Sequence, residues 1–183
     1  MQKPGLIKYI LFAGLLGGTL DILAAIIILA KGNVIGTFKF IAAGYFGIDA
    51  AFSGGAGMIV WGFLFHFFIA TCFAAGYFLL YPYLPFLHKN KWISGLLYGA
   101  FMWTWMNYVI LPFTHTPPDA FTWQAALRNW VIVSICVSLP IAWLADCLAT
   151  NVSDSTLLPA LAAGDFPLLC YLPTEPGDTF LTA

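Results

Sequence analysis

The sequence predicts an all-α membrane protein with four transmembrane helices, and two observations lead to this fold class. Of the 183 residues, 61% are hydrophobic and only 8% are charged, and the mean hydropathy is +0.89. A soluble domain carries about 25% charged residues, so this chain lacks the polar surface that a water-soluble globule needs. In addition, the apolar residues form long blocks rather than scattered patches. We therefore expect the lipid bilayer to surround most of the molecule.

Four apolar blocks are long enough to cross the membrane. They run from about Leu6 to Ala30, Gly57 to Tyr81, Trp92 to Pro112 and Gln124 to Leu148. Each has roughly 20–25 residues, which matches the ~20 residues that a helix needs to cross a ~30 Å hydrocarbon layer. Helices are expected because backbone groups in lipid must pair within their own segment, and a four-strand barrel cannot close.

Two segments outside these blocks are predicted to have a different structure. Residues 34–48 are apolar and glycine-rich but too short to span, which predicts an extra interfacial or re-entrant helix between the first and second spans. After Leu148, prolines and a loss of helical periodicity predict a loosely ordered C-terminal tail. The chain thus divides into a four-helix transmembrane domain, residues 1–148, and a tail, residues 149–183.

Basic residues predict that both ends of the chain face the cytoplasm. Four lysines fall on one side of the membrane and three basic residues on the other: Lys3, Lys8, Lys89 and Lys91 against Lys31, Lys39 and Arg128. Lys89 and Lys91 are the strongest evidence for this orientation, because they lie in a short loop and the positive-inside rule works best for short loops. The first apolar block is longer than the ~7–15 residues of a secretory signal, so we expect a retained helix.

Three polar residues inside the spans are the candidate functional residues: Asp21, His66 and Asn107. Each lies about 15 residues from the predicted cytoplasmic end of its helix, or ~22 Å at 1.5 Å per residue, so the three should form one layer. One hypothesis is a relay that holds or moves a proton. The other is a structural clasp, in which the three side chains satisfy one another and fix the order of the helices.

Glycines with G-x-x-x-G spacing occur twice, as Gly14 with Gly18 and Gly95 with Gly99. Such pairs form a flat groove that lets another helix approach closely. The partner is either a helix of the same molecule or a second chain, which leaves open a homo-oligomer or a membrane partner protein.

Several functions and contacts lack support in the sequence. A net charge of −1 gives no field that would attract nucleic acid. Neither a nucleophile–base set nor a phosphate-binding glycine loop is present, so we expect no enzyme and no cofactor. One histidine and one aspartate in the layer are too few for a metal site. Near the predicted outer face, we expect Arg128 to pair with Asp49 or Asp119, and Asp119 or Thr122 to cap the fourth span.

A family resemblance rests on a pattern of glycine, histidine and aromatic residues. From Phe40 to Tyr81 the pattern is Ile41-Ala42-Ala43-Gly44, Gly54-Gly55, Gly62, His66-Phe67-Phe68-Ile69-Ala70 and Tyr77. With Asp21, Gly95-Leu96-Leu97-Tyr98-Gly99 and Leu111-Pro112, it resembles the small YagU-like inner-membrane proteins of bacteria, over about residues 6–148. The resemblance implies a compact four-helix protein of the bacterial inner membrane with no assigned reaction.

Two functions follow as expectations. The first is a non-enzymatic multi-pass protein with a structural, stress-related or partner-binding role. The alternative is a small-solute or proton-linked transporter or channel that uses the layer of Asp21, His66 and Asn107.

Overall fold

The computed structural model describes residues 4–84, 87, 90–116 and 122–153, and every element within these ranges is a helix. Three helical stretches are long and apolar enough to cross a membrane: Leu6–Leu29, Ala56–Leu80 and Trp123–Leu148. The all-helical fold class is therefore confirmed, and the apolar helices have the character expected of a membrane protein. Most of the predicted tail lies outside the described residues, but residues 149–153 continue the last helix.

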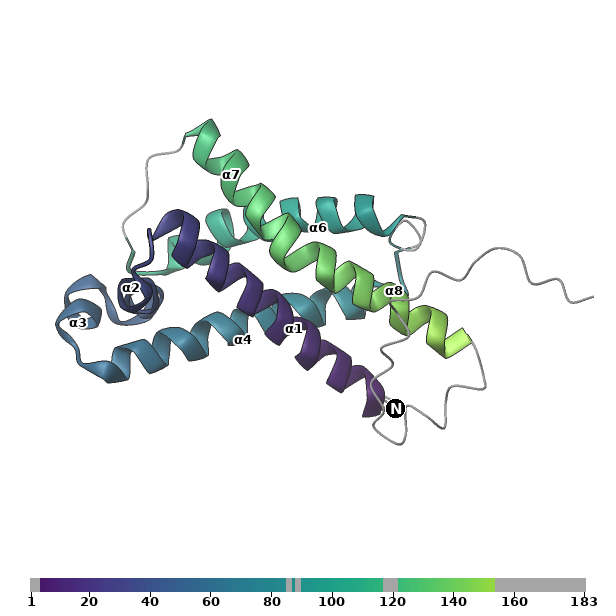
Figure 1. Cartoon of the computed structure of the whole chain (residues 1–183), viewed down its shortest axis with the longest axis horizontal. Helices are drawn as coiled ribbons and strands as arrows, with labels where there is room; N and C mark the ends of the chain where they lie inside the picture. The colour runs from purple at the N-terminus through teal and green to yellow at the C-terminus, as the bar shows by residue number, and fades with distance from the viewer. Residues whose placement is uncertain (1–3, 85–86, 88–89, 117–121, 154–183) are drawn as a thin grey trace, which may run out of the picture.

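Four long helical stretches run back and forth along the molecule (Figure 1). The first is α1 (Pro4–Ala24) with η1 (Ala25–Leu29), and the second is α4 (Ala56–Leu80). The third is α6 (Lys91–Trp105) with η2 (Met106–Ile110) and η3 (Leu111–Phe113). The fourth is α7 (Trp123–Val133), η4 (Ser134–Ser138) and α8 (Leu139–Ser153).

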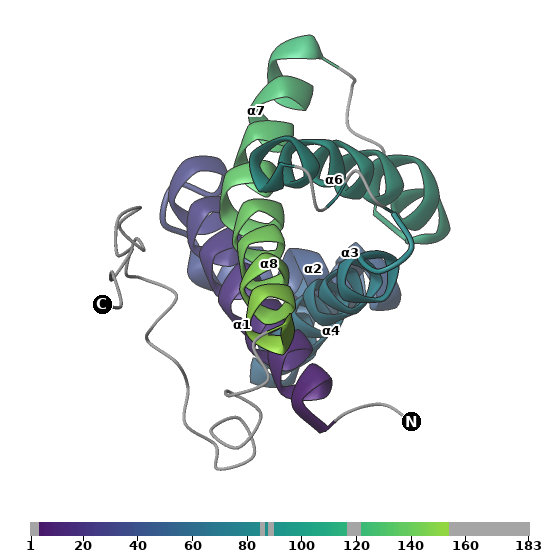
Figure 2. The same ribbon diagram turned by 90° about the vertical axis from the view of Figure 1, so that its right-hand side faces the viewer.

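The two ends of this bundle differ. We name the proximal end as the one where α1 begins, α4 ends, α6 begins and α8 ends; it lies at the right of Figure 1. The opposite, distal end holds η1, η2, the start of α4 and the start of α7. Figure 2 views the proximal end and shows α8 between α1 and α6. The start of α1 and the end of α8 thus lie on the same side of the molecule.

The third predicted span is present as a helix but is less apolar than the other three. The stretch from α6 through η3 matches it in position, yet it is not among the helices that are long and apolar enough to cross a membrane. Tryptophan and tyrosine rings and the amide of Asn107 replace aliphatic side chains in this stretch, which lowers its hydropathy. The structure therefore supports three spans, and a fourth remains a proposal.

The predicted short helix after the first span is also present, as α2 (Val34–Phe46) followed by α3 (Ile48–Ser53). Asn33 caps α2 by accepting a hydrogen bond from the N–H of Gly36 at 2.8 Å. Gly47 separates the two helices with a φ of 85°, a conformation that favours glycine. In Figure 1, α2 is seen nearly end-on while α1 and α4 run across the picture. Hence α2 crosses the long helices rather than running parallel to them.

The four glycines of the G-x-x-x-G pairs lie where helices meet. A β-carbon at Gly14 would overlap Thr71 of α4, and one at Gly18 would press against Phe67 and Ala70. Similarly, Gly95 faces Leu139 of α8, and Gly99 faces the two serines that begin and end η4. These glycines therefore serve close packing inside one molecule.

Candidate functional site

A cavity of about 770 Å³ lies between the distal halves of the helices. Residues of α1, η1, α2, α3, α4, α6, η2 and α7 line it. The side chains of Asn33, Thr122 and Arg128 belong to this lining and are exposed, so the cavity reaches the surface at the distal end. Two of the π-helical turns, η1 and η2, contribute to its wall, and such turns often occur at functional sites.

The structure brings Asp21, His66 and Asn107 to this one cavity, where they form the group that we call the cavity floor. In the described part of the chain, however, no hydrogen bond joins any two of the three side chains. They therefore share a space without satisfying one another.

His66 and Asn107 each bond to the backbone rather than to Asp21. His66 contacts the carbonyl oxygen of Gly18 through Nε2 at 2.8 Å. Since a carbonyl only accepts, Nε2 must carry a hydrogen and donate it to Gly18. Asn107 donates from Nδ2 to the carbonyl of Trp103 at 2.8 Å, which leaves its Oδ1 free to accept. With the carboxylate of Asp21, the floor presents acceptors to the cavity.

At the other end of the cavity the pattern is reversed. Four residues, which we call the cavity mouth, include the positive charge of the lining, the guanidinium of Arg128: Asn33, Thr122, Arg128 and Asn129. The Asn33 oxygen accepts from Gly36 N–H, Thr122 Oγ1 from Ala125 N–H at 3.3 Å, and Asn129 Oδ1 from Arg128 Nε at 3.4 Å. The amide and guanidinium N–H groups are left to face a ligand or water.

The sequence did not predict the cavity mouth, although two of its residues, Thr122 and Arg128, were singled out for other roles. Thr122 caps α7, as one of two predicted alternatives had it. Arg128 does not form the predicted ion pair with Asp49, because within the described residues the single ion pair joins Lys91 and Asp146. Asp119, the other predicted partner, lies outside the described residues. Arg128 instead lines the cavity, one turn and a half into α7.

One further group of the wall is an unsatisfied donor. The indole Nε1 of Trp103 is buried and has no hydrogen-bond partner, and the residue lines the cavity. This atom is inaccessible to water, so it does not face the open space of the cavity, and leaving it unpaired costs free energy in the folded protein.

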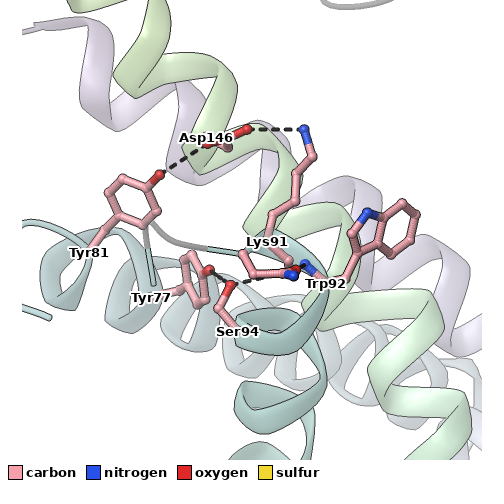
Figure 3. Close-up of polar contacts among 7 residues, drawn as sticks. Tyr77, Tyr81, Lys91, Trp92, Ser94 and Asp146 are labelled. Atoms are coloured by element: carbon pink, nitrogen blue, oxygen red, sulfur yellow. Dashed lines mark hydrogen bonds and ion pairs between the residues drawn. The ribbon is translucent and has the colours of Figure 1, made fainter. Parts of the chain in front are cut away.

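A second polar cluster lies at the proximal end (Figure 3). Lys91 Nζ and Asp146 Oδ2 form an ion pair at 3.1 Å, and the hydroxyl of Tyr81 donates to Asp146 Oδ1 at 3.4 Å. Deeper in the bundle, the hydroxyls of Tyr77 and Ser94 are 3.0 Å apart. Burial, followed by the negative charge of Asp146, raises the pKa of Tyr81 to about 12. The cluster ties together the proximal ends of α4, α6 and α8.

Neither a metal site nor a similar protein identifies the function of the cavity. Over residues 4–84, 87, 90–116 and 122–153, no three His, Cys, Asp or Glu side chains gather as a metal ion would need. Comparison of the chain with protein-family models, with curated proteins and with solved structures finds no match. The geometry of the cavity is therefore the basis for a functional proposal.

Proposed function

We propose that the chain is a four-span protein of the bacterial inner membrane with its proximal end in the cytoplasm, and that it is related to the YagU-like proteins. In this arrangement α6, η2 and η3 form the third span, and α2 lies along the outer face. The back-and-forth course of the helices supports it, because an even number of spans places the start of α1 and the end of α8 on the same side (Figure 1). Lys8 and Lys91 then lie inside, in keeping with the positive-inside rule.

We further propose that the cavity binds a small polar solute from the outer face, and that Asp21 holds a proton or a cation at its floor. The observation that carries this proposal is that Asp21 faces a cavity of about 770 Å³ and forms no hydrogen bond with His66 or Asn107, which bond to the backbone instead. A clasp would pair the three side chains. A bare carboxylate at this depth costs at least ~2.5 kcal/mol, so it requires water, a proton or a ligand.

This geometry favours the transporter alternative over a purely structural role. The volume is within the range of about 300–1,000 Å³ that small-molecule sites occupy. Besides Asp21, the charged or titratable side chains around the cavity are His66, Tyr108 and Arg128. His66 also has a structural part, because its bond to Gly18 joins α4 to α1.

Thiol labelling tests whether the cavity is open to water on the outer side. With the native cysteines replaced by alanine, Ala126→Cys in the cavity wall should react with a membrane-impermeant maleimide added outside whole cells. Ala74→Cys is the matched control, because Ala74 is fully buried in the helix core, and it should stay unlabelled.

Proton flux tests the role of Asp21. In liposomes that contain the protein and a pH-sensitive dye, an imposed proton gradient should dissipate faster than in empty liposomes, and Asp21→Asn should remove the difference. Equal rates for both proteins, or an unreactive Ala126→Cys, would refute the proposal.

A further inference from the structure

The cavity is polarised, and its polarity identifies the chemical class of its ligand; this inference rests on the proposed function. The floor offers two acceptors, the carboxylate of Asp21 and Oδ1 of Asn107, and the carboxylate is its negative charge. The mouth offers donors, with the guanidinium of Arg128 as its positive charge. A ligand that matches both ends must carry a donor-rich cation and an acceptor-rich anion.

The two opposite charges do not neutralise each other. Asp21 and Arg128 line the same cavity, yet among the residues that the structure describes they form no ion pair. Both remain available to a ligand. An ammonium group gives three donors to the floor, and a carboxylate or phosphate accepts from the guanidinium in a two-pronged geometry.

Aromatic residues form part of the cavity wall. The aromatic rings of Phe40, Trp103 and Tyr108 line the cavity, and an ammonium group binds well next to such rings. The wall thus suits a compact molecule with a short apolar linker.

We propose that the cavity binds a small zwitterion, with its primary ammonium at Asp21 and its carboxylate or phosphate at Arg128. The same chemistry occurs in a free amino acid and in the headgroup of phosphatidylethanolamine, so the experiment contains one arm for each source.

The experiment titrates the full chain in an uncharged maltoside detergent and follows tryptophan fluorescence. The probes are unbranched ω-amino acids from glycine to 6-aminohexanoate, each with the alkylamine and the carboxylate of the same length as matched controls. In the lipid arm, phosphatidylethanolamine is added to the micelles, with phosphatidylglycerol as the control that lacks an amine. Trp103→Phe shows whether the fluorescence change comes from the cavity.

We expect one amino acid, or phosphatidylethanolamine, to bind about tenfold or more tightly than its matched controls, since each charged hydrogen bond contributes roughly that factor. Asp21→Asn and Arg128→Gln should each abolish this preference, and Asp21→Glu should keep it. Asp49→Asn, which changes a carboxylate outside the cavity lining, should bind as the wild type does.

Other outcomes overturn the inference in distinguishable ways. If the amine alone or the carboxylate alone binds as tightly as the zwitterion, the ligand class is wrong while the proposed cavity function stands. If no probe binds in either arm, the ligand class is wrong, and the labelling and flux experiments above decide separately whether the cavity function is wrong too.

Discussion

At the scale of single residues, His66 and Asp21 face the same cavity but relate differently to the protein. The imidazole of His66 bonds to the carbonyl of Gly18 on another helix. For Asp21, no hydrogen bond to the described residues is present, so its carboxylate is available to whatever fills the cavity. The stability of the fold and the function of the cavity are thus assigned to different side chains.

A stability comparison in detergent checks this division. His66→Leu should lower the free energy of unfolding by about 0.6–1.7 kcal/mol, because it removes one bond between helices inside the membrane. Asp21→Asn should leave the free energy of unfolding unchanged or raise it, since the neutral amide costs less to bury than a carboxylate. A loss of similar size in both variants would indicate a mutual clasp.

Tyr81 provides a test of the proximal cluster through pH. Its pKa of about 12 lies above the value of about 10 for an unfolded tyrosine. A group whose pKa is raised by folding stabilises the fold below the lower value, and this contribution is lost as pH rises through the higher one. We therefore expect the contribution of Tyr81 to be complete below about pH 10 and to vanish through about pH 12.

The measurement is the phenolate absorbance of the wild type minus that of Tyr81→Phe. Asp146→Asn should move the midpoint down toward about 10, because it removes a negative charge that opposes ionisation, while burial keeps part of the shift. An unchanged midpoint would mean that Asp146 does not interact with Tyr81.

At the scale of helices, the docking of α2 on α4 depends on one glycine. A β-carbon at Gly62 would overlap the backbone carbonyl of Phe38. Gly62→Ala should therefore lower the free energy of unfolding by about 1–3 kcal/mol, the usual cost of overpacking. Chemical denaturation in detergent measures the change.

Gly57 supplies the matched control in the same helix. A β-carbon there meets open space, so Gly57→Ala should be neutral or should stabilise the protein by up to about 1 kcal/mol through helix propensity. If both variants were equally stable, the close approach of α2 to α4 would be incorrect.

The sequence predicted where the helices lie, but not their π-helical turns or the contacts between them. Apolar block length located the long helices and the short helix after Asn33, because both depend on local composition. The π-helical turns were not predicted: η1 and η2 hold no proline or glycine that would mark them. The pair of Lys91 with Asp146 joins residues far apart in sequence, and only the packing of α6 on α8 brings them together.

At the scale of the whole molecule, the proposed topology has a direct test. A reporter that is active only in the cytoplasm should work when fused after Lys91 or Thr150, and should fail after Gly32 or Pro118. Residue 118 lies outside the described residues, but the fusion depends only on the order of the spans. Activity after Gly32 together with silence after Lys91 would invert the orientation.

The cavity itself could be predicted only in part. Depth along each helix placed Asp21, His66 and Asn107 in one layer, since depth follows from counting residues. It could not show that the three would line an open space. That space exists because the distal parts of α1, α2 and α7 enclose it, and Asn33 and Arg128 line one cavity only through that arrangement.

The depth of Asp21 also has an electrical consequence under the proposed topology. Asp21 lies 8 residues before Leu29, the outer end of its apolar stretch, and 15 residues after Leu6. A cation that enters from outside therefore crosses about a third of the membrane before it reaches the carboxylate. A full crossing is worth about 2.3 kcal/mol per 100 mV, so this step gains about 0.8 kcal/mol at an interior-negative potential of that size. A zwitterion has no net charge, so the membrane potential contributes little to its binding free energy. The resting potential of the cell would therefore strengthen the binding of cations and protons at Asp21 and leave the affinity for the zwitterion largely unchanged.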